Sequence, residues 1–287
     1  MPPLRGLAVD RRVGYKDTAP DGADGTKFTS ASESMRIRIN CFSWLAVLAI
    51  ALSIAAGCQS SRNSQNACCS TAVCSLPAQA SPPTQAAQVA MTPAQALAEL
   101  KAGNARFVAG HPLKRNLPAD VKATASGQYP FAVVLSCIDS RQPIEIVLDQ
   151  GIGGIFSARV AGNVLNEDIL GSMEFACKVS GAKLIAVIGH SNCGAIKGAL
   201  DDVQLGNLTG LLAKIKPAMD AVPAEVQPRT SRNYKFVDGV SEANVRLVMQ
   251  QIRERSPILR EMLDQGQIEL VGGMYDLSTG EVHFFEK

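Results

Sequence analysis

Two stretches set the architecture of this chain, FAVVLSCIDSR at residues 131–141 and LIAVIGHSNCG at residues 184–194. Each begins with a run of apolar residues that is typical of a buried strand and ends in a polar turn. The first turn carries Cys137, Asp139 and Arg141, and the second carries His190 and Cys193. In parallel α/β sheets ligands bind beyond the carboxyl ends of the strands, so we expect these side chains to share one site.

Apolar strand patterns alternate with helical patterns through the second half of the chain, which predicts an α/β fold. We therefore expect a mainly parallel sheet flanked by helices on both faces. The turn at 278–280 is too short for a crossover, so the segment after it should form an antiparallel edge strand. The strands are expected at 131–136, 155–160, 183–189, 268–274 and 282–285, and the main helices at 93–109, 144–148, 167–179, 194–200, 242–255 and 257–265.

The composition is that of an ordinary globular protein with one sizeable core. Of 287 residues, 46% are hydrophobic and 19% are charged, and the net charge is +2. Nucleic-acid binding usually needs a concentrated basic face, which this balance does not indicate. Aromatic residues make up only 5% of the chain, which also disfavours a stacking platform for single strands. We expect a small-molecule partner and no nucleic acid.

The N-terminal part resembles an export signal. Residues 35–58 combine a basic start, a short apolar run and the small-residue exit Ala-Ala-Gly before Cys58. This end is similar to a bacterial lipobox and predicts lipidation of Cys58, a membrane anchor and a periplasmic or cell-envelope location; plain secretion and an uncleaved anchor are alternatives. We expect translation to start at Met35, with residues 1–34 a mis-called extension, or else an unusually long basic region.

Residues 59–90 are rich in Ser, Gln, Ala and Pro, a composition that cannot bury enough apolar surface to fold. They predict a flexible tether in which Cys68, Cys69 and Cys74 are incidental or oxidised thiols. The folded domain is expected to span residues 91–287.

Two cysteines and one histidine are the ligand set of a catalytic zinc site, in which three protein ligands leave the fourth position open. Cys137, His190 and Cys193 are the expected ligands, and Cys193 would lie near a helix N-terminus that favours its thiolate. Asp139 and Arg141 can form a bidentate pair that orients the carboxylate beside the metal. Alternatively, Asp139 could take the fourth position and close the site, or the pair could be purely structural.

The pattern Cys-x-Asp-x-Arg followed by His-x-x-Cys-Gly resembles that of the β-class carbonic anhydrases. The similarity runs from about Met91 to Lys287 and includes the sequences DQGIG at 149–153, RVAGN at 159–163 and ELVGGMYD at 269–276.

The resemblance implies a Zn²⁺ cofactor on the three ligands, with Asp139 and Arg141 as a catalytic dyad. It implies substrate-binding roles for Gln128, Phe156, Ala161 and Phe175. It also implies a homodimer or a higher multiple of dimers, with the cleft at the subunit boundary.

The implied reaction is the zinc-hydroxide-catalysed, reversible hydration of carbon dioxide to bicarbonate and a proton. Two alternatives are a carbonyl sulfide or carbon disulfide hydrolase on the same site, and a non-catalytic zinc module. A structural zinc site should have four closed protein ligands and no Asp–Arg dyad, so an intact dyad argues against the latter.

Overall fold

A computed structural model of the chain describes residues 80–285. The predictions for residues 1–34, for the signal 35–58 with Cys58, and for residues 59–79 of the tether lie outside these described residues. Within the described part of the chain, none of the helices combines the length and the apolar character that a membrane crossing requires.

A five-stranded sheet forms the centre of the domain, with the strand order β2-β1-β3-β4-β5. The first four strands are parallel and β5 is antiparallel to β4, which confirms the predicted sheet. The short turn before β5 leaves no room for a crossover, and this dictates its direction. The strands are β1 (Ala132–Ser136), β2 (Ile155–Arg159), β3 (Leu184–His190), β4 (Glu269–Tyr275) and β5 (Val282–Phe284).

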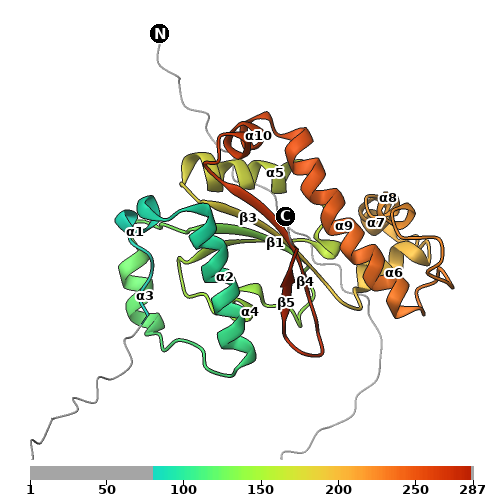
Figure 1. Ribbon diagram of the computed structural model, residues 1–287, viewed down its shortest axis with the longest axis horizontal. Coiled ribbons are helices and arrows are strands. Elements are labelled where there is room, and N and C mark those ends of the chain that lie inside the picture. The colour runs from blue at the N-terminus through green and yellow to red at the C-terminus, as the bar shows by residue number, and fades with distance from the viewer. Residues whose placement is uncertain (1–79, 286–287) are drawn as a thin grey trace, which may run out of the picture. The chain divides into compact units, whose positions relative to one another are not determined.

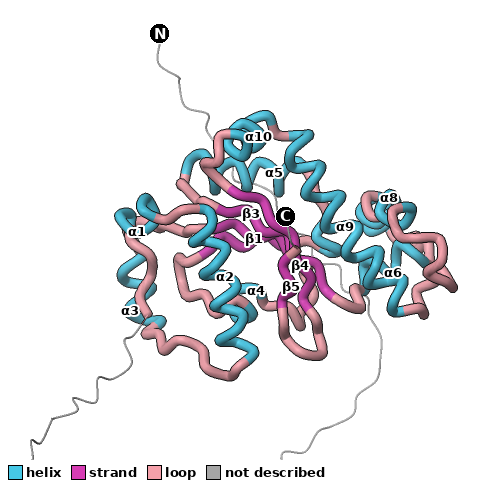
Figure 2. The backbone as a smooth tube through the Cα atoms, in the orientation of Figure 1, coloured by secondary structure: helices cyan, strands magenta, loops and turns pink. Residues whose placement is uncertain are grey.

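Helices cover both faces of this sheet (Figures 1 and 2). They are α1 (Gln85–Ala90), α2 (Pro93–Val108), α3 (Leu117–Thr124), α4 (Ile144–Val147), α5 (Glu167–Glu174), α6 (Gly194–Leu200), α7 (Gly206–Ala213), α8 (Lys216–Asp220), α9 (Tyr234–Arg255) and α10 (Pro257–Asp264).

Each strand sends alternate residues to opposite faces, so the central strands must be apolar throughout. Val133 on β1 and its register partner Ile185 on β3 enter the core beneath α5, α9 and α10. Their neighbours Ala132 and Leu184 enter the core beneath α2 and α4. Since both faces are dry, all residues of β1 and β3 are buried, and the ends of these strands are fixed in space.

The tether prediction is wrong for its last residues. Residues 85–90 form α1, capped by Thr84, whose hydroxyl accepts a hydrogen bond from Ala87 N. Gln88 is buried and donates hydrogen bonds to the carbonyl oxygens of Pro130 and Ser180. The Gln88 side chain holds this short helix on the domain by satisfying two loop carbonyls. The helix can therefore pack on the domain although it has few large apolar residues.

Other predicted elements shift in extent. Helix α9 begins at Tyr234, eight residues before the predicted start, because Phe236, Val237 and Val240 bury one face across Gly239. The predicted helix 167–179 is α-helical only to Glu174 and continues as a π-helix, Phe175–Val179. Helices α1, α3, α7 and α8 were not predicted, because short amphipathic turns give too few periods to recognise.

Candidate active site

The three predicted metal ligands converge at the carboxyl edge of the sheet. Cys137 directly follows β1, His190 is the last residue of β3, and Cys193 precedes α6 as its N-cap. Their ligand atoms all lie within 4.8 Å of one another, and all three side chains are buried. Among the described residues this is the one such group that could hold a metal ion.

The histidine presents a free nitrogen to the two sulfur atoms. His190 Nδ1 lies 2.9 Å from the carbonyl oxygen of Ser191, which can only accept, so Nδ1 carries the proton and donates. Nε2 then bears a lone pair, and it is buried without a hydrogen-bond partner. An orphaned buried acceptor beside two thiols is the arrangement that a zinc ion satisfies, so these residues fit the metal.

The two thiols form a coupled pair. A hydrogen bond from Cys193 lowers the pKa of Cys137, and the same contact, which keeps the proton on Cys193, raises the pKa of Cys193. Cys137 also accepts a hydrogen bond from Gly162 N, 3.3 Å from its sulfur. The contact thus favours a single shared proton on the two sulfurs, and a metal held by both thiolates would displace that proton.

The loop that supplies this N–H needs its glycine. Gly162 has φ +64°, and a Cβ there would lie 2.8 Å from Ile215 Cδ1. Its carbonyl oxygen accepts a hydrogen bond from Asn244 Nδ2 on α9. The conformation that aims the amide at Cys137 is thus available to glycine and is held from the opposite side by a buried side chain.

Asp139 and Arg141 form the predicted pair. Arg141 Nε lies 2.9 Å from Asp139 Oδ1, Arg141 Nη2 lies 2.7 Å from Oδ2, and the Arg141 amide also donates to Oδ1. These bonds hold the pKa of Asp139 well below its ordinary value, so the carboxylate stays ionised. Asp139 Oδ2 lies 3.8 Å from His190 Nε2, which places the carboxylate beside the ligand cluster.

Two of the predicted cleft residues meet each other. Phe156 on β2 and Phe175 at the start of the π-helix contact edge to face, with ring centroids 6.2 Å apart. Both line a cavity of about 740 Å³ between β2 and α5. Ala161 does not line this cavity; it begins the 3₁₀ turn that contains Gly162, next to Cys137.

Gln128 is not brought to the site within one chain. It is exposed and lies in the connection between α3 and β1, at the amino end of the strand. Cys137 and Asp139 follow the opposite, carboxyl end of the same strand. Five residues of strand span about 17 Å, which separates Gln128 from the ligands of its own subunit.

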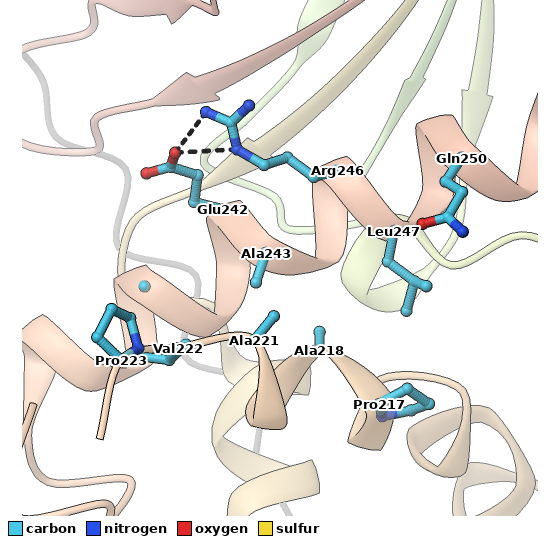
Figure 3. Close-up of a pocket in the computed structure, with 11 residues that line it drawn as sticks. Pro217, Ala218, Ala221, Val222, Pro223, Glu242, Ala243, Arg246, Leu247 and Gln250 are labelled. Carbon is cyan, nitrogen blue, oxygen red and sulfur yellow. Dashed lines mark hydrogen bonds and ion pairs between the residues drawn. The ribbon is translucent and has the colours of Figure 1, made fainter.

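A second hollow lies away from this chemistry. Figure 3 shows it between α8 and α9, with the ion pair of Glu242 and Arg246 on its rim. Its volume is about 380 Å³, and none of the predicted site residues lines it.

Two residues near the ligands were not singled out from the sequence. Arg159, the last residue of β2, donates hydrogen bonds to the carbonyl oxygens of Cys137 and Asp139. Gly189 lies directly before His190, where a Cβ would meet Val245 at 2.8 Å and Met274 at 2.9 Å. Arg159 was detectable as a charged residue near the end of the predicted strand 155–160, whereas the close contacts at Gly189 depend on tertiary packing.

Comparison with known proteins gives consistent results. The sequence matches the family described as "Carbonic anhydrase" over residues 132–282. It is 36% identical over 189 residues to carbonic anhydrase 2 of Mycobacterium tuberculosis, covering 66% of this chain and 90% of the relative. A carbonic anhydrase of Mycolicibacterium smegmatis is 35% identical over 191 residues, covering 66% of this chain and 92% of the relative.

Solved structures agree. A β-carbonic anhydrase of Aspergillus fumigatus aligns with a TM-score of 0.53 at 26% identity, covering 67% of this chain and 90% of that one. A tetrameric β-carbonic anhydrase of Sordaria macrospora aligns with a TM-score of 0.52 at 25% identity, covering 59% of this chain and 87% of that one.

Proposed function

The chain belongs to the carbonic anhydrase family and is a zinc enzyme of CO2 hydration, and on this premise we propose that Cys137, His190 and Cys193 hold the zinc. The observation that carries this assignment is the convergence of one imidazole nitrogen and two sulfur atoms within 4.8 Å. Zinc, when bound by these donors, polarises a water molecule and lowers its pKa.

Asp139 and Arg141 act on the attacking water. Arg141 occupies both carboxylate oxygens of Asp139 from one side, which fixes the plane of the carboxylate. Because the pKa of Asp139 is held low, its oxygens remain hydrogen-bond acceptors at neutral pH. Asp139 Oδ2, which lies 3.8 Å from His190 Nε2, can then accept a hydrogen bond from the water. This bond orients the water so that a lone pair on its oxygen points toward the carbon of CO2.

Substrate binding relies on apolar surface. CO2 is small, linear and without net charge, so an apolar wall holds it without competing for the water's hydrogen bonds. Phe156 and Phe175 offer such a wall, and Phe175 is half exposed in the single chain. We assign these two residues, together with Ala161, to the substrate cleft.

The assignment is tested on the purified protein by metal analysis and stopped-flow CO2 hydration in a pH-indicator assay. We expect one zinc ion per chain, since the described residues hold one such ligand group, and hydration above the buffer rate. Carbonyl sulfide is assayed in parallel. If the zinc-loaded protein does not raise the rate of CO2 hydration above the uncatalysed rate, the assignment is wrong. If it hydrolyses carbonyl sulfide faster than it hydrates CO2, the substrate is carbonyl sulfide.

We further propose a homodimer, or a multiple of dimers, in which Gln128 serves the site of the partner subunit. Gln128 is exposed and lies at the amino end of β1, on the far side of the strand from its own Asp139. Phe175, which contacts Phe156 on the edge strand β2, is 50% exposed, and this supports a subunit contact there.

Mixed dimers test this arrangement. Gln128→Ala and Asp139→Asn chains, each carrying a different affinity tag, are co-expressed and the mixed species is isolated. If Gln128 acts across the boundary, one site per mixed dimer is intact and about half of the parent activity returns. If Gln128 acted within its own chain, the mixed dimer would be as inactive as the two single variants.

We propose that the protein is exported and anchored to the membrane through a lipid on Cys58. The support for this proposal is the signal-like sequence at residues 35–58. The test is expression of the full chain and of Cys58→Ala in a bacterial host, followed by fractionation and mass spectrometry of the N-terminal peptide. We expect a diacylated Cys58 in the membrane fraction and loss of that lipid in the variant. An unmodified Cys58 in the cytosol would overturn the proposal.

A further inference from the structure

Arg159 joins two parts of the site through the backbone. Its Nε lies 3.0 Å from the carbonyl oxygen of Cys137, and its Nη2 lies 2.7 Å from the carbonyl oxygen of Asp139. One guanidinium therefore bridges the residue that supplies a metal ligand and the residue that supplies the carboxylate. It does so without touching either side chain's reactive atom.

The position of Arg159 explains why this contact is possible. Arg159 ends β2 and is the register partner of Ser136, which ends β1. Beyond Ser136 the chain leaves the sheet, so the carbonyls of Cys137 and Asp139 lose the ladder partners that strand residues have. The Asp139 carbonyl oxygen also accepts a hydrogen bond from the Gln142 amide at 3.0 Å, so Arg159 gives the Cys137 carbonyl a partner and the Asp139 carbonyl a second one. An unsatisfied carbonyl in a partly buried loop is costly, and one fixed fork of N–H donors reaches both.

We infer that Arg159 is a positioning residue for the CO2-hydration reaction, setting the separation between the Cys137 sulfur and the Asp139 carboxylate. This inference rests on the proposed function of the site. The carboxylate must lie within hydrogen-bond reach of the attacking water, and a displacement of about 1 Å can cost on the order of 10²-fold in rate. Arg141 fixes the orientation of the carboxylate from its own loop, whereas Arg159 fixes that loop to the sheet.

Lysine cannot replace this contact. Its ammonium is a single point on a flexible stem, so it can approach one of the two carbonyls but cannot span both as the planar guanidinium does. Arg159→Lys therefore separates the loss of geometry from the loss of charge, and Arg159→Ala removes both.

The chain offers a matched control in Arg229. This residue also donates to two backbone carbonyls, that of Met219 in the last turn of α8 and that of Val222 just after it, and neither belongs to a proposed ligand. Arg229→Ala should lower the resistance to urea while the site stays intact. This variant measures how much stability is lost when an arginine that donates to two backbone carbonyls is removed at a place away from the site.

The experiment uses zinc-loaded parent, Arg159→Ala, Arg159→Lys and Arg229→Ala proteins. We measure kcat and KM for CO2, the rate of zinc loss to a chromophoric chelator, and hydrogen exchange of the peptide that contains residues 137–141. For Arg159→Ala we expect kcat to fall roughly 10- to 100-fold, zinc to leave roughly 10- to 100-fold faster, and the peptide to exchange faster. Arg159→Lys should recover only part of each loss.

Three outcomes would overturn the inference. In the first, both Arg159 variants keep the parent values of kcat, zinc loss and exchange. In the second, Arg229→Ala changes those values as much as Arg159→Ala does, which would make the effect one of general stability. In the third, Arg159→Lys behaves as the parent, which would leave charge alone as the cause. Failure of the parent itself to hydrate CO2 would instead contradict the proposed function, so the two failures are distinguishable.

Discussion

At the scale of single residues, the site depends on which atoms are left without a partner. His190 Nε2 is buried without a hydrogen-bond partner, and the hydrogen bond from Nδ1 to the Ser191 carbonyl leaves the lone pair on Nε2. Asp139 is committed to Arg141, which holds it beside the ligands while both of its oxygens stay charged. Each group is thus oriented by a neighbour that does not itself react, and this gives the groups separable roles.

The separation of roles is testable by exchanging single atoms. Asp139→Asn keeps the shape of the side chain but removes its charge, so we expect the zinc content to stay and kcat to fall about 10²-fold. Cys193→Ser removes a sulfur donor, so both zinc and activity should be lost. Metal analysis and stopped-flow hydration on the same samples check both.

Cys177 provides the control for the thiol. It is buried in the apolar core, and burial raises its pKa to about 12, so it is inert. Cys177→Ala should keep zinc and activity. Parent-like hydration by Asp139→Asn, or zinc retained by Cys193→Ser, would contradict the roles assigned here.

At the scale of elements, the ligands are held where helices approach strands closely. Helix α9 packs on β3 beside Gly189, and the same helix supplies Asn244 to the carbonyl of Gly162. Ser256 serves two helices, since it follows α9 and its hydroxyl accepts the Leu259 amide at the start of α10. Small or polar residues at these contacts therefore set how closely α9 packs against β3, the Gly162 loop and α10.

Gly189→Ala should force α9 away from β3. The added Cβ would lie 2.8 Å from Val245 Cγ2 and 2.9 Å from Met274 Sδ, which is closer than packing allows. We expect a loss of about 1–3 kcal/mol in the free energy of unfolding, measured by urea denaturation. The control is Gly210→Ala in α7, where nothing lies within 4 Å, and it should stabilise by about 0.5–1 kcal/mol. Equal effects of the two changes would disprove the packing argument.

Ser256→Ala should loosen α10 and the end of α5 together. The Ser256 hydroxyl caps α10 and donates to Glu174 Oε1 at 2.5 Å, and Ser256 is fully buried. Loss of the cap and of the bond to Glu174 should cost about 1–3 kcal/mol in urea denaturation. Ser172→Ala, which removes an exposed hydroxyl bonded only to its own helix, is the control and should change the midpoint little. A midpoint unchanged by Ser256→Ala would refute the shared-cap interpretation.

At the scale of the whole domain, one buried carboxylate connects α2, the segment after it and the end of α4. Asp149 accepts hydrogen bonds from Arg106, Arg115 and the Leu113 amide, and its side chain is 2% exposed. Burial raises the pKa of Asp149, but the two guanidinium groups outweigh burial and hold it below its ordinary value.

This carboxylate makes the stability of the domain depend on pH. Since folding lowers the pKa of Asp149, its contribution is complete above the pKa of an unfolded Asp, about 4, and is lost as pH falls through the lower folded value. Asp149→Asn should cost about 2–4 kcal/mol at pH 7, because two partly buried arginines lose their partner. The difference between parent and variant should be constant from about pH 5 to 8 and shrink below about pH 4.

Urea denaturation across this pH range checks the dependence. Asp202→Asn, which breaks an exposed pair with Lys216, is the control and should leave the curve unchanged. A difference at Asp149 that stayed constant down to acid unfolding would show that its charge is not the cause.

The sequence predicted the ligand set and the sheet because both follow from local pattern. Apolar runs of strand length ending in Cys137 and His190 fix the strands and the edge at which the ligands gather, and the short 278–280 turn fixes the direction of β5. The early start of α9 and the packing of Gln88 could not be predicted in this way. Both depend on tertiary contacts, one across a helical glycine and one to carbonyls 42 and 92 residues away.

The pairing of β1 with β3 places Ser136 opposite Ile188, so Cys137 and His190, one and two residues further along their strands, emerge at the same edge of the sheet. A slip of one residue in this pairing would shift Cys137 by about 3.3 Å and point its side chain to the other face. Retention of the metal therefore depends on the register of the two central strands, because a chain with β1 misaligned against β3 would not bring its ligands close enough to hold the ion.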